Sequence, residues 1–280
     1  MIAGMMSFSR RTFLGAAAAA SLPGLPLGLP IGCQTYPVRQ ALGKDFDGTL
    51  KSLAAAGFKR IEMCSPKGYE RGGYGPLVGM KPSEMRERIA AAGLACESSH
   101  YQFRELKESL DDRIAFAREL GLKQMVLSTF SMPKTATLAD WARAAGELNK
   151  IAEKIRSAGL ATGFHNHNVE FTQIEGTLIY DKLLAELDPK LVSMQFQTWV
   201  VTMGVDLVAM LTRHPGRFLS LHLQDWTTGT GEKMQPIGKG SVDWKKVFKA
   251  ARKAGVKNYF VEMDLDLMKD SVPYLQSLKA

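Results

Sequence analysis

The order of β-rich and helical segments constrains this chain more than any other feature. From Pro30 onward, short apolar runs alternate with amphipathic, Ala-rich runs, and a new apolar run starts about every 30 residues, the length of one βα unit. The expected strands cover residues 31–36, 59–64, 95–100, 124–129, 161–166, 192–198, 219–224 and 258–263. Eight such units in about 250 residues predict a single-domain α/β fold, a (β/α)8 TIM barrel over residues 30–280.

Glycines at the ends of the helical runs support this prediction. Five expected helices stop at a glycine shortly before the next strand: 46–56, 82–92, 106–120, 138–158 and 242–254. Glycine favours this position because it adopts the left-handed conformation that closes many helices. A doubly wound sheet is the competing architecture, and the lack of a G-x-G-x-x-G pattern after the first strand disfavours it.

Residues 1–29 have the character of a targeting segment. Ser9-Arg10-Arg11-Thr12-Phe13-Leu14 precedes an Ala-rich apolar stretch, and this order resembles the twin-arginine (Tat) signal pattern. It predicts the Tat translocon as a partner, a periplasmic location, and no stable membrane association after export. The alternative is an amphipathic N-terminal extension.

The charge pattern argues against a nucleic-acid partner. The formal net charge is +8, but no run of Lys and Arg exceeds two residues. A nucleic-acid surface would cluster these cations and interleave them with aromatic side chains. Apolar stretches in the body of the chain are also far shorter than the roughly 20 residues that a membrane span needs.

Polar side chains gather near the carboxyl ends of the later strands, where barrel enzymes carry their active sites. Because side chains alternate along a strand, His165, Gln197, His222 and Glu262 can converge at the barrel mouth from four successive strands. Two imidazoles, an amide oxygen and a carboxylate form a credible site for one divalent cation, such as Mn, Co, Zn, Fe or Mg. The alternative is a hydrogen-bonded polar plug in the barrel.

Further side chains are expected around this site. Glu62 and Glu170 are spare carboxylates for proton transfer, beside Glu262 and His165, and Tyr36, Arg39 and Tyr101 are additional candidates at the mouth. Trp199 and Trp226 can stack on a sugar ring, or pack at the rim, and Lys239 can meet an anionic group, or remain a solvated loop residue. The residues expected to bind substrate are His100, His167, Gln195, Trp199, Gln224, Trp226 and Lys239.

At this point the chain resembles the xylose isomerase-like TIM barrel superfamily, in particular its sugar phosphate isomerase/epimerase branch, the AP endonuclease 2-like group. The residues that carry the resemblance are Gly32–Arg39, Phe164–Phe171, Leu221–Asp225, Gly238–Trp244 and Phe260–Asp264. The resemblance implies one divalent metal held by Glu, Asp, His and Glu. His222 and Glu262 match the last two of these ligands, whereas His165 and Gln197 stand where the family has Glu and Asp.

The resemblance implies an isomerase or epimerase that moves a proton next to the carbonyl of a sugar or keto-sugar. Both departures remove a negative charge, and a histidine in place of the first glutamate suits elimination or hydration as well as epimerisation. A lyase or hydratase acting on a 3-keto-glycoside is therefore an alternative, and a non-catalytic sugar-binding barrel is another. An endonuclease would need more metal ligands and a basic groove. The expected partner is a small carbohydrate, and a homo-oligomer is left open.

Overall fold

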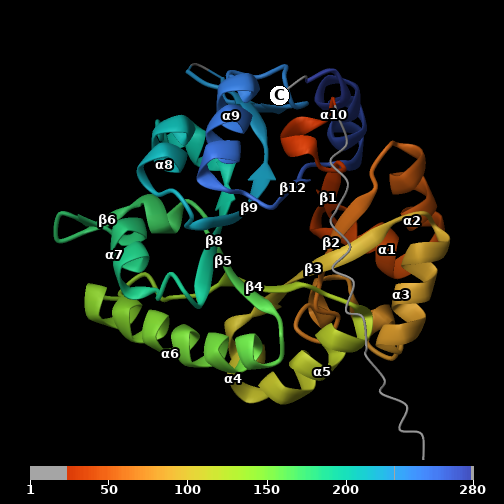
Figure 1. Cartoon of the computed structure of the whole chain (residues 1–280), viewed down its shortest axis with the longest axis horizontal. Coiled ribbons are helices and arrows are strands. Elements are labelled where there is room, and N and C mark those ends of the chain that lie inside the picture. Colours follow the sequence, from red (N-terminus) through yellow and green to blue (C-terminus); the bar gives the residue numbers. More distant parts are fainter. Residues whose placement is uncertain (1–23, 230, 279–280) are drawn as a thin grey trace, which may run out of the picture.

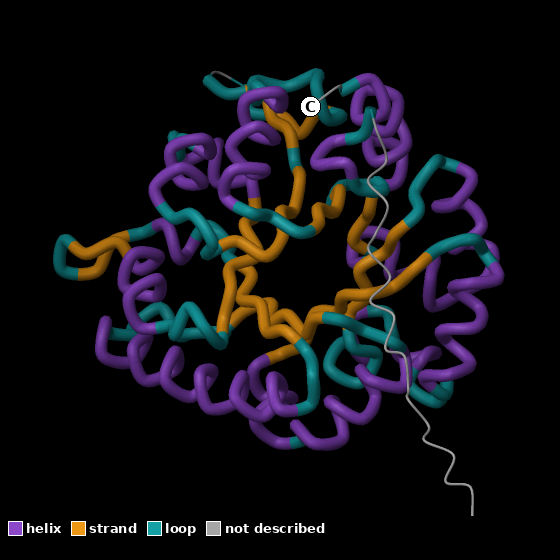
Figure 2. The backbone as a smooth tube through the Cα atoms, in the orientation of Figure 1, coloured by secondary structure: helices purple, strands orange, loops and turns teal. Residues whose placement is uncertain are grey.

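Eight parallel strands close into a barrel in the computed structural model of the chain, which describes residues 24–229 and 231–278. Figures 1 and 2 show the ring of strands with the helices packed around its outside. The barrel strands are β1 (Gly32–Gln34), β2 (Arg60–Cys64), β3 (Ala95–Gln102), β4 (Gln124–Thr129), β5 (Ala161–His165), β8 (Val192–Gln197), β9 (Phe218–Leu223) and β12 (Asn258–Val261). The pairing of Gly32 with Phe260 closes the ring, so the predicted TIM barrel is confirmed.

The helices connect successive strands. They are α1 (Arg39–Lys44), α2 (Phe46–Ala55), α3 (Pro82–Ala91), α4 (Phe103–Glu108), α5 (Leu110–Leu120), α6 (Leu138–Ser157), α7 (Ile179–Glu186), α8 (Leu207–Arg213), α9 (Trp244–Ala254) and α10 (Leu265–Ser277). The expectation of one helix over 106–120 is wrong, because Ser109 has a non-helical φ of −141° and separates α4 from α5. As predicted, glycines end several helices; Gly121 closes α5 with a φ of +92°.

No helix among residues 24–229 and 231–278 combines the length and the apolar character that a membrane span requires. The twin-arginine motif expected at 9–14 lies outside the described residues, so the predicted targeting segment stays a prediction.

Side-chain alternation divides each strand between two environments. Phe196, Leu221, Leu223 and Val261 are fully buried and pack in the apolar layer between strands and helices. The opposite face of the same strands points into the barrel and carries amides, imidazoles and carboxylates. Buried polar groups of this kind need hydrogen-bond partners, so the barrel interior must form a connected network.

A buried aspartate fixes the loop before α9. Asp225 begins β10 (Asp225–Thr227), which pairs with β11 (Lys233–Gln235) in a hairpin. Its carboxylate accepts hydrogen bonds from the backbone N–H groups of Gly238 (2.8 Å), Gly240 (3.2 Å) and Val242 (3.3 Å), and from Nε1 of Trp244 (2.8 Å). A side chain at Gly240 would collide with this carboxylate. Asp225 therefore holds segment 238–244 in place where it leads into α9.

We expect Asp225→Ala to lower the free energy of unfolding by about 3 kcal/mol, because it leaves several buried donors without an acceptor. Urea denaturation measures this loss. Asp243→Ala is the matched control. Asp243 caps α9 from an exposed position, so this variant should lose much less unfolding free energy than Asp225→Ala. Equal losses in the two variants would contradict this account of the loop.

Candidate metal centre and active site

Three buried imidazoles meet inside the barrel. His100 comes from β3, His165 from β5 and His222 from β9, and one ring nitrogen of each lies within 4.8 Å of the others. Their ring centroids are 4.9 Å (His100–His165), 4.6 Å (His165–His222) and 5.1 Å (His100–His222) apart. His100, expected to bind substrate, is thus part of the imidazole cluster itself.

Glu62 lies against this cluster and is completely buried. Its carboxylate accepts hydrogen bonds from Gln34 Nε2 (2.8 Å), Gln195 Nε2 (2.9 Å) and the Ser98 hydroxyl. It also contacts His222 Nε2 at 2.5 Å and His100 Nε2 at 3.1 Å. Glu62 was expected near the mouth as a spare carboxylate; it lies instead inside the barrel with both oxygens hydrogen-bonded.

The charges around Glu62 keep it ionised. Burial alone would raise the pKa of Glu62, but the adjacent imidazoles of His100 and His222 outweigh burial and hold this pKa well below its ordinary value. Glu62 therefore acts as a fixed, buried hydrogen-bond acceptor.

Gln195 determines which ring nitrogen carries a hydrogen in two of the imidazoles. Its amide nitrogen must face Glu62, because an ionised carboxylate accepts hydrogen bonds and cannot donate them. Its amide oxygen then faces His100 Nε2 at 2.6 Å and His165 Nδ1 at 3.0 Å, and both nitrogens must carry the hydrogen. The other ring nitrogen of each residue, His100 Nδ1 and His165 Nε2, is therefore the one left to bind a ligand through a lone pair.

His222 lies between two carboxylates. Its Nε2 faces Glu62 at 2.5 Å, and its Nδ1 faces Oε2 of Glu262 at 3.1 Å. Burial alone would lower the pKa of His222, but Glu262 and Glu62 outweigh it and raise this pKa to about 9. The ring is then an imidazolium that donates to both carboxylates.

The structure brings the predicted metal ligands together. Glu262 Oε2 accepts from Gln197 Nε2 at 2.5 Å as well as from His222, and Glu262, Gln197 and His165 line one cavity. Burial alone would raise the pKa of Glu262, but His222 outweighs it, so this pKa lies below the ordinary value and the carboxylate is ionised.

These donors fit a divalent cation. His100 Nδ1 and His165 Nε2 can supply imidazole ligands, and Glu262 supplies a carboxylate, a donor set typical of Zn and neighbouring transition metals. Bonds of about 2.1 Å put ligand nitrogens on one tetrahedral ion about 3.4 Å apart. One nitrogen of each of the three rings lies within 4.8 Å of the others, so the rings would draw closer together around an ion. His222 would join the set on losing its Nδ1 proton, so that a cation takes the place of that proton.

Two cavities open from this centre at the barrel mouth. The imidazole cavity has a volume of about 260 Å³ and is lined by Tyr36, Tyr69, His100, Gln102, Ser128, Thr129, His165, His167 and Glu262. The Trp199 cavity, of about 330 Å³, is lined by Tyr36, Pro37, Arg39, His165, His167, Gln197, Trp199, Gln224, Met234, Glu262, Met263 and Asp264. His165, His167 and Glu262 line both, so they face whatever molecule enters.

His167 and Glu170 lie just beyond β5. The His167 ring has no hydrogen-bond partner among the described residues, and burial lowers its pKa, so the imidazole is neutral near pH 7. The Glu170 carboxylate is buried beneath it and accepts a hydrogen bond from the His167 backbone N–H at 2.7 Å. Glu170 was expected to face the mouth as a spare carboxylate. It is buried instead and holds the His167 backbone in place.

Other predicted residues divide between the cavities and more distant positions. Trp199 and Gln224 line the Trp199 cavity, and so do Tyr36 and Arg39. Trp226 stacks on Trp199 with a centroid distance of 5.8 Å and lines neither cavity.

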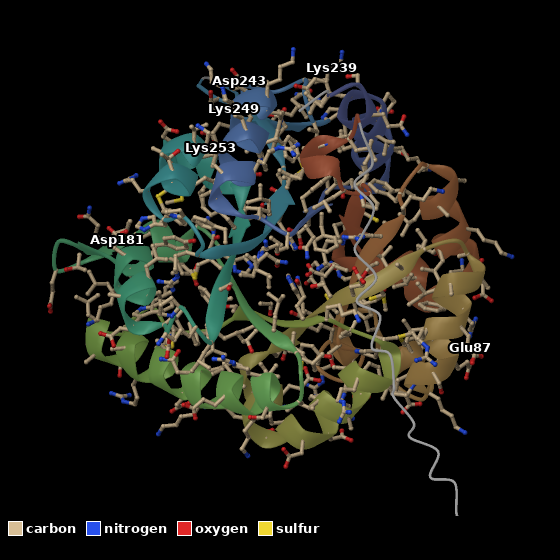
Figure 3. All side chains as sticks on the ribbon, in the orientation of Figure 1. Glu87, Asp181, Lys239, Asp243, Lys249 and Lys253 are labelled. Carbon is tan, nitrogen blue, oxygen red and sulfur yellow. The ribbon has the colours of Figure 1, made fainter. Side chains whose placement is uncertain are left out.

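Three further candidates do not face the mouth. Gln195 and Tyr101 are fully buried, and Lys239 is exposed at the outer edge of the molecule (Figure 3). Gln195 therefore positions imidazoles instead of contacting substrate.

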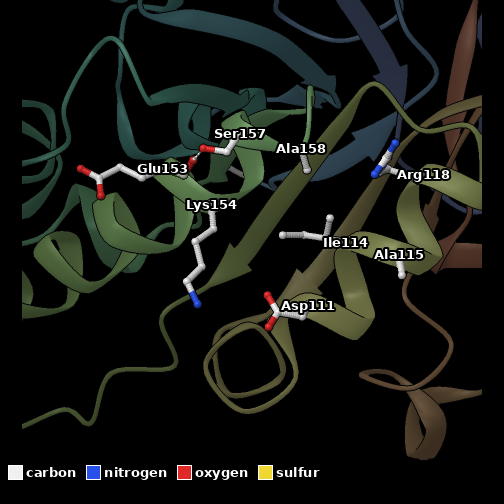
Figure 4. Close-up of a pocket in the computed structure, with 8 residues that line it drawn as sticks. All are labelled: Asp111, Ile114, Ala115, Arg118, Glu153, Lys154, Ser157 and Ala158. Atoms are coloured by element: carbon white, nitrogen blue, oxygen red, sulfur yellow. Dashed lines mark hydrogen bonds between the residues drawn. The ribbon is translucent and has the colours of Figure 1, made fainter.

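Tyr69 and Gln102 line the imidazole cavity, and neither had a predicted role. Tyr69 lies in a Gly-rich loop, and its hydroxyl donates to Ser128 at 2.6 Å across the mouth. A larger hollow of about 660 Å³ lies away from this chemistry, between the outer helices α5 and α6 (Figure 4). Its lining, which includes Asp111, Arg118 and Lys154, contains no residue of the barrel interior.

Comparison with known proteins identifies the family. The model of the xylose isomerase-like TIM barrel family matches residues 50–277. The chain belongs to this family. It is therefore a xylose isomerase-like enzyme whose buried His100, His165 and His222 form a candidate metal site.

Its similar relatives carry names of two kinds. The chain is 27% identical over 264 residues to an inosose dehydratase of Geobacillus thermodenitrificans (strain NG80-2), covering 83% of this chain and 86% of that protein. It is 24% identical over 293 residues to an inosose dehydratase of Lacticaseibacillus casei, covering 91% and 95%. A sugar phosphate isomerase/epimerase structure from Parabacteroides distasonis superimposes with a TM-score of 0.74 and 25% identity, covering 94% and 96%.

We expect Glu170→Gln to change how stability depends on pH. Burial raises the pKa of Glu170 to about 7, above its unfolded value, so folding is penalised increasingly as the pH rises from about 4.5 through 7. The variant lacks this penalty. Relative to wild type it should gain about 2 kcal/mol more unfolding free energy at pH 8 than at pH 5.

Chemical denaturation at the two pH values measures this difference. Glu175→Gln, at an exposed position of the same loop, is the matched control. A Glu170→Gln variant whose stability relative to wild type is the same at pH 5 and pH 8 would show that Glu170 is not a buried acid of this kind.

Proposed function

We propose that this protein is a metal-dependent lyase that eliminates water or an alcohol from a keto-sugar, such as a 3-keto-glycoside. The observation that carries the proposal is the connected cluster of His165, Gln197, His222 and Glu262. Two of its members, His165 and Glu262, line both polar cavities together with the neutral His167. The inosose dehydratases among its relatives support a lyase, because dehydration is an elimination.

The metal would be held by His100, His165, His222 and Glu262, and Gln197 would hold Glu262 in place through its amide nitrogen. A divalent cation bound there supplies polarisation of the substrate carbonyl and stabilises negative charge on its oxygen. Gln195 and Glu62 keep the imidazoles oriented through their other nitrogens. Such outer hydrogen bonds fix the tautomer and orientation of metal-binding histidines.

His167 is the proposed acid and base. It is neutral and lines both cavities, so it can accept the proton from the carbon next to the carbonyl. The electron pair of that C–H bond forms a carbon–carbon double bond as the bond from the adjacent carbon to its oxygen substituent breaks. His167 then returns the proton to the departing oxygen, which leaves as water or an alcohol, and no oxidant is consumed.

This assignment divides roles that sequence analysis could not separate. Glu262 was a candidate both for ligand and for base. Its oxygen is engaged by Gln197 and His222, and its lowered pKa makes it a poor proton acceptor. We therefore assign Glu262 to the metal and proton transfer to His167.

An isomerase or epimerase is the second candidate. The likeness to the sugar phosphate isomerase/epimerase structure favours it. It shares the first step, removal of a proton next to a carbonyl, and differs in returning the proton to carbon instead of losing a substituent.

We expect wild-type protein, incubated with 3-keto-glycosides in deuterated water, to form an enone detected by its ultraviolet absorbance. A chelator should abolish this activity, and added Zn or Mn should restore it. His167→Gln and Glu262→Gln should each lower kcat by at least about 100-fold, since each removes a proton-transfer or metal-binding group.

His214→Gln is the control, because His214 follows α8 on the outside of the barrel. Deuterium exchange without elimination would support the isomerase or epimerase instead of the lyase. Sugar binding without exchange or elimination would contradict both and identify a binding protein.

A further inference from the structure

A third cavity adjoins the imidazole cavity and carries most of the positive charge at the mouth. It has a volume of about 580 Å³ and shares Tyr36, Tyr69 and Gln102 with the imidazole cavity. Its remaining lining residues are Lys67, Gly68, Glu70, Arg71, Gly72 and Arg104, and we name it the cationic cavity. None of its charged residues had a role predicted from the sequence.

Charge is distributed unequally across the mouth. The cationic cavity has three cations, Lys67, Arg71 and Arg104, against one carboxylate, Glu70. On the other side of Tyr36, the Trp199 cavity has one cation, Arg39, against the carboxylates of Glu262 and Asp264. A substrate with one anionic end would therefore be oriented with that end in the cationic cavity.

The guanidinium groups of the cationic cavity are available to a ligand. No hydrogen bond or ion pair of the described residues engages the side chain of Arg71. Arg104 faces Glu108 at 3.6 Å, and both side chains are largely exposed. Exposed ion pairs of this kind are weak, so a ligand oxyanion can replace them. Guanidinium groups bind carboxylate and phosphate through paired hydrogen bonds.

Hydrogen bonds and ring contacts order the wall between the imidazole cavity and the cationic cavity. The Ser65 hydroxyl donates to the buried Glu105, and the Tyr69 hydroxyl donates to Ser128 at 2.6 Å. The Tyr36 ring packs edge-on against Tyr69 at 5.9 Å, and Arg39 lies 4.1 Å from the Tyr36 centroid. These contacts attach the loop after β2, which carries Lys67 and Arg71, to Ser128 of β4 and to Tyr36 after β1.

We propose that the substrate carries an oxyanion, a carboxylate or a phosphate, on the part of the molecule remote from the reacting carbonyl. Arg71 and Arg104 bind this group in the cationic cavity while the ring that reacts occupies the imidazole cavity. The inference rests on the proposed function in one respect: it assumes that a sugar-like substrate occupies the imidazole cavity.

Calorimetric titration of the full-length protein with glucose, glucuronate and glucose 6-phosphate tests this proposal without turnover. We expect at least one anionic sugar to bind at least tenfold more tightly than glucose. The carboxylate and phosphate arms distinguish the two sources of the oxyanion. The double variant Arg71→Gln, Arg104→Gln should remove this preference and leave the affinity for glucose unchanged.

The matched control is Arg143→Gln, Arg156→Gln, which removes the same charge from the outer helix α6 and should keep the preference. Equal affinities for the three sugars, or a preference that survives in the Arg71/Arg104 variant, would overturn the proposal. A protein that keeps the preference but has no lyase activity would reject the proposed function and retain the anion site.

Discussion

An ionised carboxylate inside a barrel is stable only if its charge is compensated and its oxygens are hydrogen-bonded, and Glu62 imposes that constraint on its surroundings. Gln195 must present its amide nitrogen to Glu62 and therefore its oxygen to His100 and His165. This arrangement directs the lone pairs of two imidazoles away from Glu62. The chemistry at the mouth thus depends on a carboxylate that is itself completely buried.

The second consequence concerns His222. Between Glu62 and Glu262 the ring carries a proton, and a cation that binds the Nδ1 atom of this ring must displace that proton. His165 and Gln197 carry no negative charge, so the carboxylates that contact His222 are Glu62 and Glu262. Glu62 supplies its charge from inside the barrel.

Sequence periodicity predicted the barrel because each βα unit repeats the same local pattern. The strand at Gln124–Thr129 was predicted to the residue, and alternation correctly placed His165, Gln197, His222 and Glu262 on the inner face. The depth of each side chain within the barrel was harder to predict. Glu62 and Gln195 were assigned to the mouth because a strand pattern reveals the face of a side chain but not which layer of the barrel it occupies.

Contacts made by loop residues were the hardest to predict. The contacts of Tyr69 with Ser128 and of Trp199 with Trp226 join segments that are far apart in sequence, and no local pattern encodes them. The break at Ser109 likewise occurs within a stretch of good helix-forming residues.

The most direct test of the metal centre is X-ray absorption spectroscopy of the purified protein after loading with zinc. The account predicts one zinc per chain, with two or three imidazole nitrogens at about 2.1 Å together with oxygen ligands. Replacing His165 with alanine should reduce the number of imidazoles, and His214→Gln should leave it unchanged. A protein that binds no zinc, or binds it through oxygen ligands alone, would contradict the central claim that His100, His165 and His222 are arranged to hold a cation.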